Sequence, residues 1–312
     1  MTLTPTTIDA VVAFLYGIVV GSFLNVCIYR LPRGESLIAP PSHCPNCNKR
    51  LQSRDLIPLF SYLSLGRKCR YCKIPISPRY FIIELITGLL FTLFYFALVR
   101  RYPLDALGPA WWGLLILAWI FVSAMLVTFV IDLETTYVIE PVMWIAMGAG
   151  LLFELLSYHM HAVPPAHPYH LASLPVPAAL PGMLIGFLVF VAMDLFGRFI
   201  FRKPSMGLGD AFIGAAIGAM LGPGLAGLSF GLAVLLCVLI SIPLLISGAL
   251  KRTPAPGAEE ARAPGSDAPL PEGLYIPFGP FLTASAVLIA LAPLWVWTHA
   301  GLLWQWWMHL FG

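Results

Sequence analysis

Residues 111 to 131 read WWGLLILAWIFVSAMLVTFVI, an apolar run without a charged side chain that ends directly before Asp132. A helix of this length rises about 30 Å, which is the thickness of the hydrocarbon core of a bilayer. The rest of the chain has the same character, because 59% of its 312 residues are hydrophobic and only 11% are charged. This composition excludes a soluble globule with a polar surface and predicts an all-α polytopic membrane protein.

Other apolar segments flank this run, and together they predict about eight transmembrane helices. With an even number of crossings, both termini lie on the same side. The first segment has no basic residue before it, so it does not resemble a cleavable signal peptide. Besides 111 to 131, the predicted segments are 8 to 29, 80 to 99, 140 to 158, 180 to 201, a shorter Gly-rich one at 207 to 222, 224 to 249 and 276 to 298.

The basic residues set the expected orientation. Ten of the 18 Lys and Arg residues lie between Arg30 and Arg79, in the loop that joins the first two predicted helices. The positive-inside rule therefore places this loop in the cytoplasm and both termini on the outer side of the membrane. Because the basic residues border membrane spans, the net charge of +3 is explained by topology, and no nucleic-acid partner is expected.

The same basic loop carries two CxxC pairs, Cys44/Cys47 and Cys69/Cys72. Two such pairs are typical of a tetrahedral site for structural zinc, since each short turn aims two sulfurs at one ion. A reducing cytoplasm would keep the thiols free for metal, whereas an oxidising compartment would favour two disulfides or a redox pair. Zinc is the favoured interpretation. Cys27 and Cys237 lie in apolar runs and are expected to be small buried hydrophobic residues.

Acidic residues in predicted spans are candidates for function because they are costly in a membrane unless they are paired or solvated. The expected topology brings Asp132, at the inner end of the third span, and Asp210, in the first turn of the sixth, to one depth at the cytoplasmic face. Alternatively, Asp132 could simply lie at a solvated helix end, and Asp210 could be a helix N-cap. We expect Glu84 and Asp194 to pair with basic neighbours or to cap structure, and Glu154 to lie near the outer end of its span.

The segment around Asp210 supports its pairing with Asp132. The glycines of Gly207-Leu208-Gly209-Asp210 permit close backbone approach, and the small residues from 214 to 219 form a face against which neighbouring helices can pack. Two adjacent carboxylates in a partly dry site share a proton, so that one activates water and the other donates to a peptide carbonyl. The sequence therefore predicts aspartic-protease chemistry at a membrane surface.

Two loops are predicted to be spacers. Residues 159 to 179 are rich in Pro and His, but the prolines and the absence of a helical i, i+4 histidine pair argue against a metal site. Residues 253 to 271 consist mostly of Ala, Pro, Gly and acids and are predicted to be a flexible cytoplasmic linker.

The chain resembles the bacterial type IV prepilin peptidases, also called leader peptidases of type II secretion. The resemblance covers nearly the whole chain and rests on motifs in a fixed order. They are residues 21 to 32 (GSFLNVCIYRLP), residues 42 to 47 (SHCPNC) with the second cysteine pair, residues 77 to 80 (SPRY) with Glu84, the acid in Ile131-Asp132-Leu133, the Gly-Leu-Gly-Asp box ending at Asp210, and residues 276 to 280 (IPFGP).

This resemblance implies an inner-membrane enzyme that removes the short basic leader of prepilins and pseudopilins after a glycine and then N-methylates the new first residue. It implies Asp132 and Asp210 as the catalytic pair and S-adenosylmethionine as methyl donor, with no binding residues for the donor assigned. The chain would divide into a first transmembrane helix (1 to 29), a cytoplasmic zinc domain associated with methylation (30 to 79) and a membrane aspartic peptidase domain (80 to 312). Glu134 and Glu140 are expected to be solvated and to attract the basic leader.

Two positions depart from the family pattern. Many members have Lys two residues after the second aspartate, where this chain has Phe212, and Pro-Asp after the first, where it has Ile139-Glu140. Two other classes of function stay open at this point. Intramembrane acids also serve transporters and channels, which often contain internal repeats that are not evident here. A membrane thiol oxidoreductase would use the CxxC pairs for redox chemistry.

Overall fold

The computed structural model describes residues 5–102, 108–159, 169–171, 174–202, 207–246, 253–254, 272–273 and 277–292, and this part of the chain is nearly all helical. Six helices are long and apolar enough to cross a membrane. They are α1 (Pro5–Arg30), α3 (Pro78–Arg101), α5 (Pro109–Thr135), α6 (Glu140–His159), α7 (Ala179–Phe201) and α8 (Leu208–Ile246), and a shorter apolar helix, α9 (Gly279–Ala290), follows them.

The remaining elements are short. The loop between α1 and α3 contains η1 (Leu31–Arg33), η2 (Ser53–Asp55) and α2 (Phe60–Ser64). Strands β1 (Tyr169–Leu171) and β2 (Leu174–Val176) form one antiparallel pair, and β3 (Thr253–Pro254) and β4 (Glu272–Gly273) form another. Most of the two predicted spacer loops, and residues 293 to 298 of the last predicted span, lie outside the described residues.

Local sequence signals account for several helix boundaries. Pro78 and Pro109 lie in the first turns of α3 and α5. Proline has no N–H, and at these positions the N–H would have no hydrogen-bond partner within the helix. The Ser77 hydroxyl accepts the Arg79 N–H and caps α3, while Thr136 ends α5 in the left-handed conformation. These boundaries lie within a few residues of the predicted spans.

Helix α8 is divided at Gly222, whose φ of 70° and ψ of 172° are not helical. Gly222 is followed by Pro223, which has no N–H to continue the helical hydrogen bonds. The first arm runs antiparallel to α7, and the second arm turns back, since Phe230 contacts Phe190 of α7 with ring centroids 5.1 Å apart. The two arms correspond to the predicted segments 207 to 222 and 224 to 249. Each of the eight predicted segments thus contains a helix among the described residues, although α9 covers only residues 279 to 290 of the last one.

Glycines on both helices allow α7 and the first arm of α8 to touch. An added Cβ on Gly214 or Gly218 would overlap the backbone of Gly186 or Gly182 in α7, and the reverse is also true. This is the small-residue packing of membrane helices. The predicted small-residue face of α8 is confirmed, but its close neighbour is α7 rather than α5, so it does not itself bring Asp210 to Asp132.

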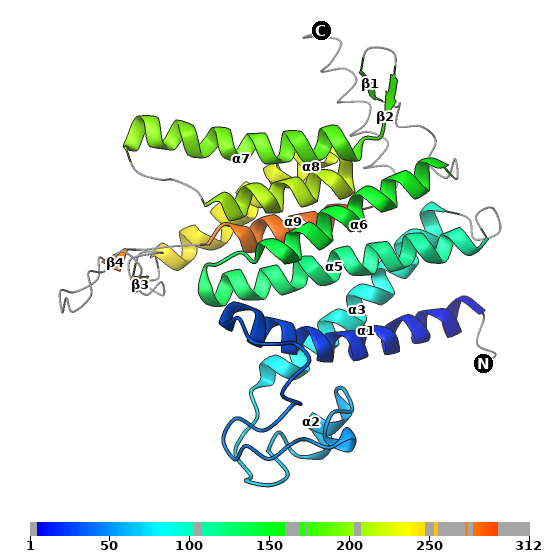
Figure 1. Ribbon diagram of the computed structural model, residues 1–312, viewed down its shortest axis with the longest axis vertical. Coiled ribbons are helices and arrows are strands. Elements are labelled where there is room, and N and C mark those ends of the chain that lie inside the picture. The colour runs from blue at the N-terminus through cyan, green and yellow to red at the C-terminus, as the bar shows by residue number, and fades with distance from the viewer. Residues whose placement is uncertain are drawn as a thin grey trace.

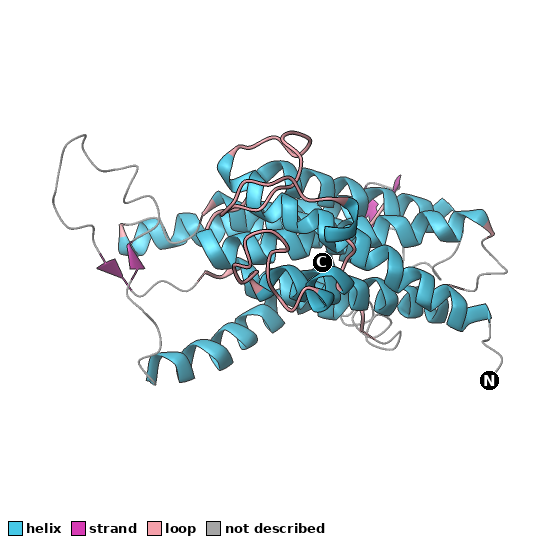
Figure 2. Cartoon of the chain, turned by 90° about the horizontal axis from the view of Figure 1, so that it is seen from below, coloured by secondary structure: helices cyan, strands magenta, loops and turns pink. Residues whose placement is uncertain are grey.

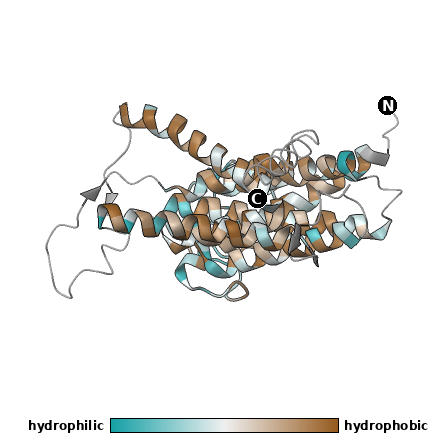
Figure 3. Cartoon of the chain, turned by 90° about the horizontal axis from the view of Figure 1, so that it is seen from above, coloured by the Kyte–Doolittle hydropathy of each residue, from teal (hydrophilic) through white to brown (hydrophobic). Residues whose placement is uncertain are grey.

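Figure 1 shows the helices side by side in one bundle, with α1 and α3 at one side, α7 at the other and α5 between them. Helix α5 is the most enclosed of the six spans, and Trp111, Leu114 and Phe121 are among its fully buried side chains. Figure 3 shows that the helices are apolar along most of their length, while hydrophilic residues concentrate at their ends and in the connecting loops. This pattern is that of a bundle whose outer surface faces lipid.

Candidate active site and cysteine cluster

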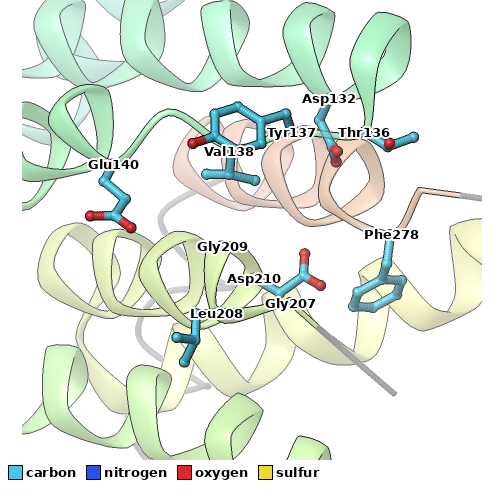
Figure 4. A pocket seen from close by; sticks show the side chains of 10 residues that line it. All are labelled: Asp132, Thr136, Tyr137, Val138, Glu140, Gly207, Leu208, Gly209, Asp210 and Phe278. Atoms are coloured by element: carbon cyan, nitrogen blue, oxygen red, sulfur yellow. The ribbon is translucent and has the colours of Figure 1, made fainter. Parts of the chain in front are cut away.

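Asp132 and Asp210 lie at the same end of the bundle, on opposite walls of one pocket. Asp132 is in the last turn of α5 and is only 5% exposed, and Asp210 is in the first turn of α8. Figure 4 shows the two carboxylates facing into the space between them. The pocket has a volume of about 280 Å³ and is lined by Asp132, Thr136, Tyr137, Val138, Glu140, Gly207, Leu208, Gly209, Asp210 and Phe278. The structure thus brings together the two acids that the topology argument paired.

The start of α9 holds the carboxylate of Asp132. The backbone N–H of Gly279 donates a hydrogen bond to it, and the positive end of the α9 dipole points at the same group. A side chain at Gly279 would displace the Asp132 carboxylate, because an added Cβ would overlap it. The sequence motif IPFGP contained this residue and Phe278, but the sequence alone gave neither of them a role.

Asp210 is held by its own helix end. It is the third residue of α8, and its carboxylate accepts the backbone N–H of Gly207, which is one half of a capping box. An added Cβ on Gly209 would lie 2.7 Å from Cβ of Val138, in the loop that follows Asp132. Gly209 therefore lets the beginning of α8 press against this loop, and this contact brings the two acids to one pocket.

The two glutamates after Asp132 differ in their surroundings. Nη1 of Arg79 donates to both carboxylate oxygens of Glu134, at 2.9 and 3.0 Å, so the charge of Glu134 is balanced by a cation on α3. Glu140 is exposed on the pocket wall. Both glutamates are therefore exposed, as the sequence predicted, and they differ in that Glu134 also forms an ion pair with Arg79.

The other acids of the spans have structural partners. Buried Glu84 accepts the backbone N–H of Leu59 at 2.7 Å and the hydroxyl of Ser22, which ties the cysteine loop to α1 and α3. Asp194 forms an ion pair with Arg198 one helical turn away, at 2.7 Å. Glu84 therefore accepts hydrogen bonds that hold the loop and α1 in place, and Asp194 pairs with a basic neighbour. Both are roles that the sequence predicted.

Phe212 occupies the position where many family members have Lys, and here its side chain packs among other aromatic rings. Its ring contacts Trp144 of α6 and Phe187 of α7, with centroids 5.7 and 5.8 Å apart. Here α8 is fixed to its neighbours by aromatic packing.

The four loop cysteines form a cluster that could hold a metal ion. Their sulfur atoms all lie within 4.8 Å of one another, and the cysteines are free. The sulfurs of Cys44 and Cys72 are 3.8 Å apart. Tetrahedral coordination with zinc–sulfur bonds of about 2.3 Å requires roughly this separation between sulfurs. The donor set and its spacing therefore fit a zinc ion.

The two CxxC segments have the same backbone conformation. The N–H groups of Cys44 and Cys69 donate to the carbonyl five residues later, at Lys49 and Ile74. In each segment the residue after the second cysteine, Asn48 or Lys73, has a positive φ. Two equivalent turns thus present four sulfurs to one point.

Hydrogen bonds brace the cluster. Asp55 of η2 accepts hydrogen bonds from Arg70 at 2.6 Å and from the Tyr71 hydroxyl at 3.0 Å, and both donors lie between the second pair of cysteines. Burial would raise the pKa of the Asp55 carboxyl, but these bonds and one from the Gln52 backbone outweigh it and hold the pKa below its ordinary value. Hydrogen bonds from the Ile74 N–H and then from Asn46 and the neighbouring cysteines lower the pKa of the Cys72 thiol to about 6. At Cys47, by contrast, the bond from the Lys49 N–H is outweighed by burial and the adjacent thiols, which raise the pKa to about 11.

Two family models match the chain. Residues 15–98 match the Bacterial Peptidase A24 N-terminal domain, and residues 119–242 match the Type IV leader peptidase family. The first match contains the cysteine cluster, and the second contains Asp132 and Asp210. Comparison with solved structures gave no match.

Curated relatives agree with these matches. A prepilin leader peptidase/N-methyltransferase from Klebsiella pneumoniae is 35% identical over 67% of this chain and 83% of its own length. A namesake from Myxococcus xanthus is 36% identical over 68% of this chain and 56% of its own length. A third, from Neisseria gonorrhoeae, is 28% identical over 95% of this chain and 93% of its own length. With its paired aspartates and its cysteine loop in the matched regions, the chain belongs to the type IV leader peptidase family.

Proposed function

We propose that this protein is a membrane aspartic peptidase that cleaves the leader of type IV prepilins and type II secretion pseudopilins and N-methylates the new N-terminus. The observation that carries the proposal is the pocket in which Asp132 and Asp210 face each other. The names of the curated relatives supply the substrate class and the second activity. A transporter or a thiol oxidoreductase is not favoured, because neither explains this pair of acids in a family of leader peptidases.

The geometry supports a mechanism of general acid–base catalysis. One carboxylate removes a proton from the attacking water, while the protonated partner donates to the carbonyl oxygen of the scissile peptide. The Gly279 and Gly207 N–H groups hold the two carboxylates on opposite walls. Exposed Leu208 and half-buried Phe278 line the pocket and offer apolar surface for the substrate chain next to the two acids.

The test of this proposal is co-expression with a prepilin followed by intact-mass analysis of the pilin. Active protein is expected to remove the mass of the leader and to add the mass of one methyl group. A pilin that keeps its full mass beside correctly folded, membrane-inserted protein would contradict the peptidase proposal. A shortened pilin without the methyl group would contradict only the methyltransferase part.

Within this function, we assign Glu140 to the basic residues of the leader, because Arg79 already balances the charge of Glu134. We expect Glu140→Gln to lower kcat/KM about 2- to 5-fold, as for a solvated charge pair, mainly through a higher KM. The measurement is cleavage of a prepilin with basic and with neutralised leaders, since the neutral leader should remove the difference. Glu134→Gln is the matched control, and an effect as large as that of Glu140→Gln would refute the assignment.

We also propose that the cysteine cluster binds structural zinc and supports methylation, with S-adenosylmethionine as donor. When bound, zinc would cross-link the two cysteine turns. Its ligands would be Cys44, Cys47, Cys69 and Cys72. We propose the domain division at residues 30 and 80 on the same basis, with the loop and the active site in the cytoplasm and both termini in the periplasm of a bacterial inner membrane.

Cys44→Ser is expected to release zinc and to disorder the loop, so that methylation is lost before cleavage. The measurements are zinc per protein by elemental analysis and the two mass changes of a co-expressed prepilin. Cys237→Ser, which alters a cysteine on α8 outside the cluster, should keep both the metal and the activities. Methylation that persists in Cys44→Ser without bound metal would contradict the expected order.

A further inference from the structure

Several large apolar side chains of the cysteine loop are exposed around the short helix α2. Phe60 is 65% exposed and Leu63 is 58% exposed, and both lie on one face because they are three residues apart. Leu56 and Ile57, just before the helix, are exposed as well. No element among the described residues covers these four side chains, which we call the α2 apolar patch.

The opposite face of α2 fixes its depth relative to the membrane. The Tyr62 ring stacks on Phe81 with centroids 5.4 Å apart, and the Leu59 N–H bonds to Glu84. Phe81 and Glu84 are three and six residues into α3, which begins at Pro78, so they lie about 5 and 9 Å along a membrane-spanning helix. Helix α2 therefore lies beside the first turns of a span, at the level where headgroups meet acyl chains.

The position of the loop beside the bundle points to lipid as its neighbour. Figure 1 shows α2 and the loop next to α1 and α3, on the side of the bundle away from α7. Seen from below in Figure 2, the loop lies in front of the helices rather than beyond their ends. At this level the space beside the outermost helices of a membrane protein is occupied by the bilayer.

The charges next to the patch suit an anionic membrane surface. Arg54, Arg67 and Lys68 are exposed on either side of α2, while the acid of this segment, Asp55, is already paired with Arg70. Basic residues near a surface that contains anionic lipid are attracted to it. Apolar and basic groups together are the pattern of a segment that lies in the interface plane.

We propose that the α2 apolar patch inserts into the boundary between headgroups and acyl chains of an anionic bilayer and anchors the cysteine loop to the membrane. The occupant of this surface is lipid. The anchor is independent of the peptidase and methyltransferase activities proposed above, because it depends only on the contacts of α2 with α3 and on the exposed side chains.

The test is photo-crosslinking of the full chain in lipid nanodiscs. A benzophenone analogue of phenylalanine is placed at Phe60 or Leu63, and at Ile38 as control, an apolar side chain of the same loop that is 92% exposed outside the patch. After irradiation, mass spectrometry of the peptides is expected to show phospholipid adducts at Phe60 and Leu63 with several-fold higher yield than at Ile38. Replacing part of the phosphatidylcholine by phosphatidylglycerol is expected to raise this yield further.

Equal lipid yields at all three positions would overturn the anchor, and so would adducts with protein in place of lipid. A yield that does not depend on phosphatidylglycerol would overturn the contribution of the basic residues. Because the probe is an aromatic residue at an exposed site, folding is preserved, and zinc content checks the loop in each variant.

Discussion

We expect Asp132→Asn and Asp210→Asn each to leave a co-expressed prepilin at its full mass. Each substitution keeps the shape of the side chain and removes its ability to exchange a proton, so the rate should fall about 10²- to 10⁴-fold. Because the proposed mechanism uses the two carboxylates as one unit, the double variant should be hardly slower than either single one. The measurement is the rate of leader removal by purified protein in detergent or nanodiscs.

The control for this prediction is Asp194→Asn. It makes the same chemical change in an acid that is paired with Arg198 on α7, away from the pocket. We expect it to cleave at the rate of the unaltered protein. Complete leader removal by both Asp132→Asn and Asp210→Asn would reject these residues as the catalytic pair.

Gly279→Ala is expected to reduce cleavage by at least about 10²-fold, although Gly279 has no side chain of its own. The added methyl group would overlap the carboxylate of Asp132, and it would also disturb the hydrogen bond from the Gly279 N–H. Displacement of a catalytic group by about 1 Å can cost this much. The measurement is kcat for leader removal, because the substitution should misplace the acid more than it weakens substrate binding.

Gly148→Ala is the matched control for Gly279→Ala. An added Cβ at Gly148 in α6 meets nothing within 4 Å, so the change should be neutral or slightly stabilising in a helix. Thermal unfolding of both variants separates a local effect on Asp132 from a general loss of fold. Normal cleavage by folded Gly279→Ala would show that α9 does not position the acid.

The helices of this protein follow from its sequence because a bilayer leaves few alternatives. In lipid, the backbone N–H and C=O groups of each segment must form hydrogen bonds with one another, so long apolar runs such as 111 to 131 form helices. The sequence also predicts two separate segments, 207 to 222 and 224 to 249. Helix α8 is divided between them, where Pro223 cannot continue the helical hydrogen bonds. The cysteine cluster was equally predictable, because the two CxxC turns are local structures.

The site itself was predicted only in outline. Counting the spans places Asp132 and Asp210 at one end of the bundle, but it cannot say which helices touch. The contacts of Gly209 with Val138 and of Gly279 with Asp132 join parts of the chain that are far apart in sequence. Which face of a helix meets which neighbour is decided by packing, and hydropathy does not encode it.

The sequence alone determined the membrane class, the helical segments, the cysteine turns and the choice of Asp132 and Asp210 as candidate acids, because each depends on composition or on residues close in the chain. The tertiary structure decided that α9 holds Asp132, that Arg79 pairs with Glu134 and not with Glu140, and that α2 packs against the first turns of α3. These features depend on side chains that meet across helices, and such contacts exist only when the whole bundle is packed.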